Sequence, residues 1–151
     1  AMTHCDASKL AKQHGKKSEY ALCAAQWHKT LTYKDDFFGD GMKYDNDFNM
    51  EFGYAPPYQA AESSAALLVW KDAFERANSF DTEKVRDALS KTEIQTFYGN
   101  IKFADTGQNT AKPMVLFQVR CEGDTCENKV VAPTKWASAE LVHPTPKWSE
   151  R

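Results

Sequence analysis

Apolar and polar positions alternate along this chain with periods that change several times. The period of about 3.6 residues that is typical of helices gives way to short apolar runs that are typical of strands. In chain order, the pattern predicts an α/β fold with helices at 6–14, 41–52, 58–78 and 83–90, strands at 20–25, 100–103, 114–120 and 128–131, and a long extended tail after residue 132.

The segment 58–78 is the most apolar part of the pattern, and the rest of the chain is organised around it. Pro56 and Pro57 hold the entry extended and stop any helix that arrives from the N-terminal side. A helix that is apolar on nearly all sides has to be buried. Trp70 is therefore expected in the core, where replacement by alanine costs about 3–5 kcal/mol.

Glu62 is the exception near the start of this helix, because it places a carboxylate among small apolar residues. One interpretation is an exposed glutamate in the first turns, which the helix dipole favours. The other is that Glu62 lies at the edge of a cleft. The pattern alone leaves both interpretations open.

The shorter helices carry end signals. Asp6 or Ser8 precedes the first helix and Gly15 ends it, and Asp81 precedes the helix at 83–90. The helix at 41–52 ends at Gly53 and has an acidic face. That face lacks the order of an EF-hand calcium loop, so a solvated surface is the preferred interpretation.

The segment 26–40 is predicted to be an irregular loop, yet it carries the aromatic residues Trp27, Tyr33, Phe37 and Phe38. Loops often carry binding residues. Aromatic side chains under a long loop can equally form a small packing cluster. Both interpretations remain open here.

The four cysteines indicate whether the protein resides in an oxidising or a reducing compartment. Cys121 and Cys126 flank four turn residues between two predicted strands, and opposed residues of a hairpin lie at a distance that suits a disulfide. Cys5 precedes the first helix and Cys23 lies in the strand after it, so they could form a second, less certain disulfide. Two local pairs favour an oxidising compartment, and four reduced thiols in a cytosolic protein are the alternative.

Composition removes several function classes. The net charge of −2 gives no basic field, so nucleic acid is not an expected partner. No apolar run is long enough to predict a membrane span, and the N-terminal residues lack the form of a signal peptide. With 151 residues, the chain has the length of one domain.

No catalytic residue set is recognisable, so an enzyme is not predicted and no cofactor is expected. The nucleophile elbow, the glycine-rich phosphate loop and the zinc-protease helix motif do not occur. A zinc site remains conceivable on ligand type alone, but the spacing is not that of usual zinc sites, and no metal is expected. Its donors would be His4, Cys5, His14, Cys23 and His28.

Several runs of the sequence resemble a known family in the same order. They are TLTYKDDFFGD at 30–40, FGYAPPYQAAESSAA at 52–66, TEKVRDAL at 82–89, FYGNIKFADTGQN at 97–109 and KPMVL at 112–116. Over about residues 8–135 the chain resembles the C-terminal half of type I periplasmic solute-binding proteins, the branch for branched-chain amino acids, amides and urea. In that family, two α/β lobes close over a small polar ligand.

The resemblance implies a partial type I periplasmic-binding-protein fold, made of pieces of three-layer αβα lobes with a C-terminal β-hairpin and an extended tail. Residues 1–135 would form half of the two-lobed fold, and 136–151 would be a tail rich in proline and tryptophan. The family's aromatic ligand contact maps near Tyr58, with Gln59 and Glu62 beside it, and Trp27 would lie near the hinge. The implied location is the periplasm or the extracellular space.

Two functions stay open at this point. The first is a solute-binding module, in fragment or half-length form, for an amino acid, an amide or urea. The second is a structural or interaction protein that keeps the half-fold without a ligand. If the chain is complete, 20–25 would be an unpaired sheet edge and the helix at 58–78 would lack the first-lobe sheet on which it packs, so a homo-oligomer, most simply a two-fold dimer, is expected.

Overall fold

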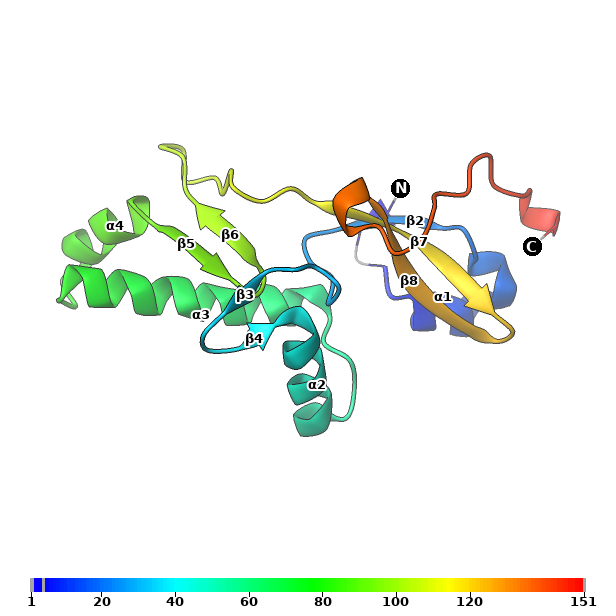
Figure 1. Ribbon diagram of the computed structural model, residues 1–151, viewed down its shortest axis with the longest axis horizontal. Coiled ribbons are helices and arrows are strands. Elements are labelled where there is room, and N and C mark those ends of the chain that lie inside the picture. Colours follow the sequence, from blue (N-terminus) through cyan, green and yellow to red (C-terminus); the bar gives the residue numbers. More distant parts are fainter. Residues whose placement is uncertain (1, 4, 151) are drawn as a thin grey trace. The chain divides into compact units, whose positions relative to one another are not determined.

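The computed structural model describes residues 2–3 and 5–150, and the chain forms two compact units (Figure 1). Unit 1 comprises residues 1–28 and 114–151, and unit 2 comprises residues 29–113. Each unit therefore has its own packing, and each is considered separately below.

Unit 1 is built on a four-stranded sheet with the order β1-β2-β7-β8. Its strands are β1 (Met2–Thr3), β2 (Leu22–Ala25), β7 (Val115–Glu122) and β8 (Thr125–Ala132). β2 pairs in parallel with β1 and antiparallel with β7. The expectation that 20–25 forms an unpaired edge is therefore wrong, because two segments distant in sequence cover both of its sides.

The two disulfides lie within unit 1. Cys5, just before α1 (Ala7–His14), is bonded to Cys23 of β2 with a Cα–Cα distance of 5.8 Å. Cys121 and Cys126 are directly opposed in the β7–β8 hairpin, 4.1 Å apart at Cα. The first cross-link therefore fastens the segment before α1 to the sheet, and the second joins the two hairpin strands near their turn.

The tail after β8 lies on this sheet through backbone and side-chain hydrogen bonds. Gln118, fully buried in β7, donates from Nε2 to the Val142 carbonyl and accepts from the Val142 amide. The Ser138 amide donates to the Val130 carbonyl. Trp136, in the short 3-10 helix η2 (Thr134–Trp136), is buried, while Trp148 of η3 (Trp148–Glu150) is half exposed.

Unit 2 consists of three helices and two small hairpins. The helices are α2 (Gly41–Phe52), α3 (Tyr58–Ala77) and α4 (Thr82–Ser90). One hairpin pairs β3 (Lys34–Asp35) with β4 (Gly39–Asp40), and the other pairs β5 (Glu93–Thr96) with β6 (Gly99–Lys102).

Helix ends in unit 2 follow side-chain caps. The Asp40 carboxylate accepts a hydrogen bond from the Lys43 amide at the start of α2, and Gly53 ends this helix in the left-handed conformation. The Asp81 carboxylate accepts a hydrogen bond from the Lys84 amide at the start of α4. The caps therefore define both ends of α2 and the start of α4, where they satisfy backbone groups.

Helix α3 differs from the sequence prediction in its burial. Ala61, Ala65, Val69 and Ala73 form one buried stripe, and these small side chains let neighbouring elements come close. Trp70 is 46% exposed and stacks on Phe74. The prediction that α3 is buried on all sides, with Trp70 in the core, is therefore wrong.

The segment after Trp27 packs some of its aromatic residues inside unit 2. Phe38 makes edge contacts with Tyr44 and Phe97, and Tyr44 stacks on Phe97 at 4.2 Å between ring centroids. The Asp35 carboxylate accepts hydrogen bonds from the Phe38 and Phe97 amides. Local packing thus accounts for Phe38.

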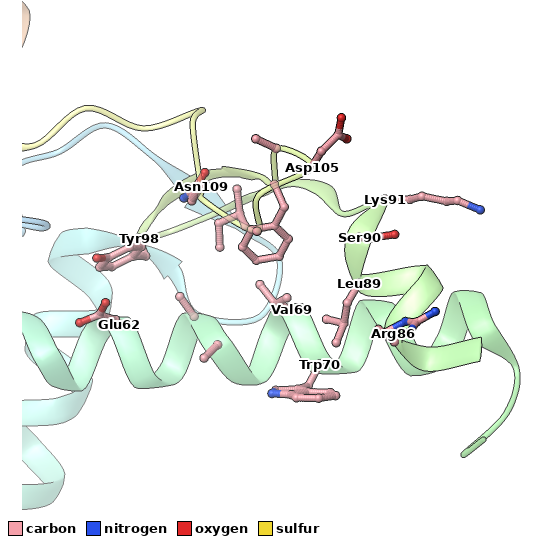
Figure 2. Close-up of a pocket in the computed structure, with 16 residues that line it drawn as sticks. Glu62, Val69, Trp70, Arg86, Leu89, Ser90, Lys91, Tyr98, Asp105 and Asn109 are labelled. Carbon is pink, nitrogen blue, oxygen red and sulfur yellow. The ribbon is translucent and has the colours of Figure 1, made fainter. Parts of the chain in front are cut away.

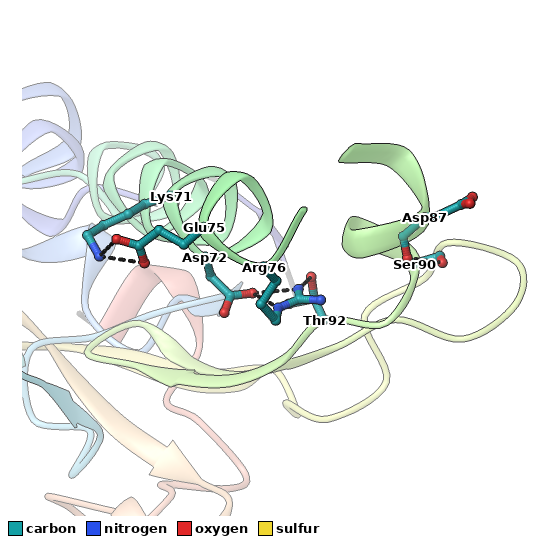
Figure 3. A network of polar contacts seen from close by, with 7 residues as sticks. All are labelled: Lys71, Asp72, Glu75, Arg76, Asp87, Ser90 and Thr92. Carbon is teal, nitrogen blue, oxygen red and sulfur yellow. Dashed lines mark hydrogen bonds and ion pairs between the residues drawn. The ribbon is translucent and has the colours of Figure 1, made fainter. Parts of the chain in front are cut away.

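A row of ion pairs follows the α3 face around Lys71 (Figure 3). Lys71 pairs with Glu75 at 2.7 Å, and Arg76 pairs with Asp72 at 2.6 Å. Arg76 also donates to the Thr92 hydroxyl, and Thr92 is buried at the start of the β5 segment. The two ion pairs lie within α3, and the hydrogen bond from Arg76 to Thr92 connects the helix to the β5 segment.

Candidate functional site

The predicted site residues Tyr58, Gln59 and Glu62 lie in the first turns of α3. Pro57 precedes them in an extended conformation, so the chain enters the helix without a side-chain cap. Tyr58 and Gln59 are partly buried, whereas Glu62 is exposed. The fourth predicted residue, Trp27, is buried in unit 1.

Glu62 lies at the edge of a cleft of about 760 Å³ within unit 2 (Figure 2). Its walls are mostly apolar and come from α3, α4 and the β6 region; they include Ala65, Val69, Leu89, Ile101 and Phe103. Glu62 and Tyr98 lie at one end of this cleft, and Arg86, Lys91 and Asp105 lie at the other. The cleft therefore offers an apolar surface between two polar ends.

Tyr98 is buried, and its environment keeps the phenol neutral. Burial, together with the negative charge of Glu62 and the nearby Tyr58, raises the pKa of Tyr98 well above its usual value. A neutral phenol can both donate and accept a hydrogen bond. Tyr98 is thus a polar group with fixed protonation beside the Glu62 carboxylate.

Lys112 contributes a buried cation next to this tyrosine. Its Nζ lies 4.2 Å from the centroid of the Tyr98 ring and is buried without a hydrogen-bond acceptor among the described residues. Burial lowers the pKa of Lys112 to about 8, while the negative charge of Glu62 opposes this decrease. At neutral pH the side chain therefore remains mostly charged, although its hydrogen-bonding capacity is not used by the protein.

Gly99 makes this position of Lys112 possible. A Cβ at residue 99 would lie 2.1 Å from Lys112 Cδ and 2.5 Å from its Cε, and Gly99 has φ +150, which side chains rarely allow. The lysine stem thus runs across the bare backbone of β6. Any larger residue at position 99 would displace Lys112 from Tyr98.

Sequence reasoning identified Glu62 but did not single out Tyr98, Gly99 or Lys112. Their runs entered only as parts of the family resemblance. The one local signal was a glycine directly after two aromatic residues, which marks a close backbone approach inside a strand. Nothing in the pattern shows that the group approaching is Lys112, thirteen positions later.

No group of three or more potential metal ligands occurs in the described part of the chain. Of the five donors considered for a zinc site, Cys5 and Cys23 are joined in a disulfide, and His4 lies outside the described residues. Within the same residues, no helix is sufficiently long and apolar to cross a membrane.

Comparison with known proteins identifies the family. The sequence profile of the periplasmic binding protein family matches residues 1–125. The chain belongs to this family. The resemblance drawn from the sequence runs is therefore confirmed.

Solved structures of similar fold agree with this assignment. A leucine-binding protein from Thermotoga maritima is 23% identical with a TM-score of 0.64, and the match covers 85% of this chain and 35% of that protein. A putative branched-chain amino acid ABC transporter from Silicibacter pomeroyi is 18% identical with a TM-score of 0.67, covering 94% and 39%. An ABC transporter substrate-binding protein from Desulfitobacterium hafniense, solved with leucine, is 17% identical with a TM-score of 0.53, covering 77% and 33%.

These likenesses establish the fold, and they confirm the predicted α/β class with a partial periplasmic-binding-protein fold. The chain spans only 33–39% of the length of these three proteins. The larger part of each relative has no counterpart in this sequence.

Proposed function

We propose that this chain is an extracytoplasmic solute-binding module for a small polar solute of the branched-chain amino acid type. The observation that supports it most is the polar group at the head of α3, where Glu62 faces Tyr98 beside an apolar cleft. A carboxylate next to an apolar surface suits a ligand with an ammonium group and an aliphatic side chain. Family membership and the leucine named for two of the structural relatives support the same ligand class.

The site residues in this proposal are Tyr58, Gln59 and Glu62 on α3 of unit 2; the fourth predicted residue, Trp27, belongs to unit 1. Units 1 and 2 would represent pieces of the two lobes, and residues 136–151 would be an added tail. Amides and urea are the competing solutes, since they are small and polar but lack the ammonium group that Glu62 would recognise.

Assembly is the second part of the proposal. Leu67 and Trp70 on α3 are exposed. A homo-oligomer, most simply a two-fold dimer, would cover this apolar surface and supply a second wall to the site. The alternative is an interaction protein that self-associates without binding a solute.

The two disulfides favour a location in the periplasm or outside the cell, where such bonds persist. A protein released by osmotic shock from its native host, with both bonds intact, would agree with a periplasmic location.

Calorimetric titration tests the ligand. The experiment titrates five solutes into the wild-type chain and two variants: leucine, isoleucine, valine, acetamide and urea. The variants are Glu62→Gln and, as a control, Glu51→Gln, the same substitution at an exposed position of α2. The proposal expects that a branched-chain amino acid binds, that Glu62→Gln weakens this binding about tenfold or more because a charged hydrogen bond is lost, and that Glu51→Gln does not. Absence of binding by all five solutes would contradict the solute-binding function.

Light scattering at micromolar concentration tests the assembly. A dimer mass, near twice the 17.1 kDa of one chain, agrees with the proposal. A single species with the mass of one chain would refute the oligomer while leaving the ligand assignment to the titration. A dimer that binds no solute would favour the interaction protein.

A further inference from the structure

The charged ammonium group of Lys112 is buried without a hydrogen-bond acceptor in the described part of the chain. Its ammonium can donate three hydrogen bonds, yet Nζ is buried and finds no acceptor among the residues that the structure describes. The contact with the Tyr98 ring compensates only part of the lost hydration, because cation–π contacts are weaker than a charged hydrogen bond. A buried cation of this kind is usually paired.

The nearest opposite charge is Glu62, but the two side chains do not neutralise each other. Glu62 acts on the titration of both Lys112 and Tyr98, so all three groups share one electrostatic environment. No ion pair between Glu62 and Lys112 occurs in the described part of the structure. The cluster therefore presents a cation and a carboxylate that are close enough to interact and yet separated.

We propose that Lys112 is the carboxylate-binding residue of this site and that, together with Glu62, it selects a zwitterionic α-amino acid. The inference rests on the proposed solute-binding function and extends it. Lys112 lies over the Tyr98 ring, next to the lining of the cleft and not part of it, so its flexible side chain would turn toward the cleft to meet the ligand. The ligand carboxylate would then accept from Lys112 Nζ and the Tyr98 hydroxyl, and the ligand ammonium would donate to Glu62. One small molecule would then satisfy both charges of the cluster.

The shape of the cleft supports this choice of ligand. Beyond Glu62 and Tyr98 the walls are formed by Ala65, Val69 and Ile101, which suit an aliphatic side chain. Neutral amides and urea carry no carboxylate, so they would leave Lys112 buried and unpaired. The cluster thus distinguishes among the three solute classes that family resemblance alone does not separate.

Gly99 supplies an independent argument. Gly99 is the first residue of β6, directly after the hairpin turn, and its missing Cβ leaves space that the Lys112 stem fills. The backbone of β6 is therefore adapted to hold the lysine over Tyr98. A side chain at position 99 would therefore disturb the contact between Lys112 and Tyr98.

Calorimetric titration of leucine and leucinamide provides the test. Leucinamide keeps the aliphatic chain and the ammonium group but replaces the carboxylate by a neutral amide. Both compounds are titrated into the wild-type chain, into Lys112→Met and into Lys84→Met, the same substitution on exposed α4 outside the cleft. Thermal melting of each variant verifies folding.

The proposal expects leucine to bind the wild-type chain and Lys84→Met equally. It expects Lys112→Met to bind leucine about ten- to a hundredfold more weakly, with leucinamide binding weakly to all three proteins. Equal leucine affinity in Lys112→Met and the wild type would overturn the role of Lys112, as would leucinamide binding as tightly as leucine; both results leave the proposed function intact. If neither compound nor any other solute binds the wild type, the proposed function itself fails.

A measurement without ligand tests the same geometry. The ¹³Cε resonance of Lys112, assigned by its loss in Lys112→Met, should titrate with a pKa of about 8. A value near the ordinary 10.5 would mean that the ammonium is hydrated, and it would remove the physical basis of the proposal.

Discussion

Replacing Lys112 by methionine should stabilise unit 2 at neutral pH, although it removes a charged side chain. The Lys112 pKa falls from the ordinary 10.5 to about 8 because the folded chain buries the ammonium. A decrease of this size corresponds to at most about 3 kcal/mol of folding free energy. Methionine has a similar length and no charge to bury, but it loses the cation–π contact worth roughly 1 kcal/mol. The net gain expected at neutral pH is about 2 kcal/mol.

The pH dependence distinguishes this explanation from simple repacking. Below about pH 8, Lys112 is protonated in both the folded and the unfolded chain, so the folded wild type carries the whole cost of burial. Between about pH 8 and 10.5 the folded chain releases the proton while the unfolded chain retains it, and wild-type stability rises with pH. The advantage of Lys112→Met should therefore shrink to under about 1 kcal/mol near pH 9.5.

Hydrogen exchange in increasing denaturant, followed on peptides of β5 and β6, measures the stability of unit 2 separately from unit 1. Lys84→Met serves as the control and should stay within about 0.5 kcal/mol of the wild type at both pH values. If Lys112→Met destabilises unit 2 at neutral pH, or if its advantage is equal at both pH values, then burial of an unpaired ammonium is the wrong explanation.

Three further changes test the packing. Ala61→Leu should cost about 1–3 kcal/mol, measured by denaturant unfolding, because Ala61 is fully buried on the α3 stripe; an unchanged midpoint would contradict that burial. Gln118→Met should lose about 1–3 kcal/mol and speed hydrogen exchange at Val142, since it removes the bonds that hold the tail; unchanged protection at Val142 would show that the tail is held elsewhere. Replacing Cys121 and Cys126 by serine should lower the stability of unit 1 by about 2 kcal/mol for so short a loop, and a loss near zero would show that the hairpin turn alone fixes the strands.

The sequence was most informative where a residue acts on its own neighbours. The helix predicted at 41–52 has the bounds of α2, since Asp40 and Gly53 are local start and stop signals. β7 and β8 extend a little further than predicted, because the turn between them needs only Gly123 and Asp124. Both results follow from contacts within a few residues.

Prediction failed where distant segments meet. β5 was missed because it is only four residues long, too short for the alternation of Glu93 and Gln95 with the more buried Ile94 and Thr96 to stand out, and only pairing with β6 reveals it. β2 was expected to be an edge, but β1, a two-residue strand, is too short to show any periodicity. The burial of α3 was overestimated since alanine and leucine positions look equally apolar in sequence, whereas the structure buries the small ones.

In the candidate site, too, one residue could be found from its local sequence and another only from the folded structure. Glu62 could be found from the sequence because a carboxylate is unusual in an apolar helix. Lys112 is unusual only in the folded chain, where its stem crosses Gly99 and its ammonium is buried over the Tyr98 ring. The buried charge reduces stability, because it lacks an acceptor among the described residues. Such a cost agrees with the proposed binding role of Lys112, in which the ligand would satisfy its charge.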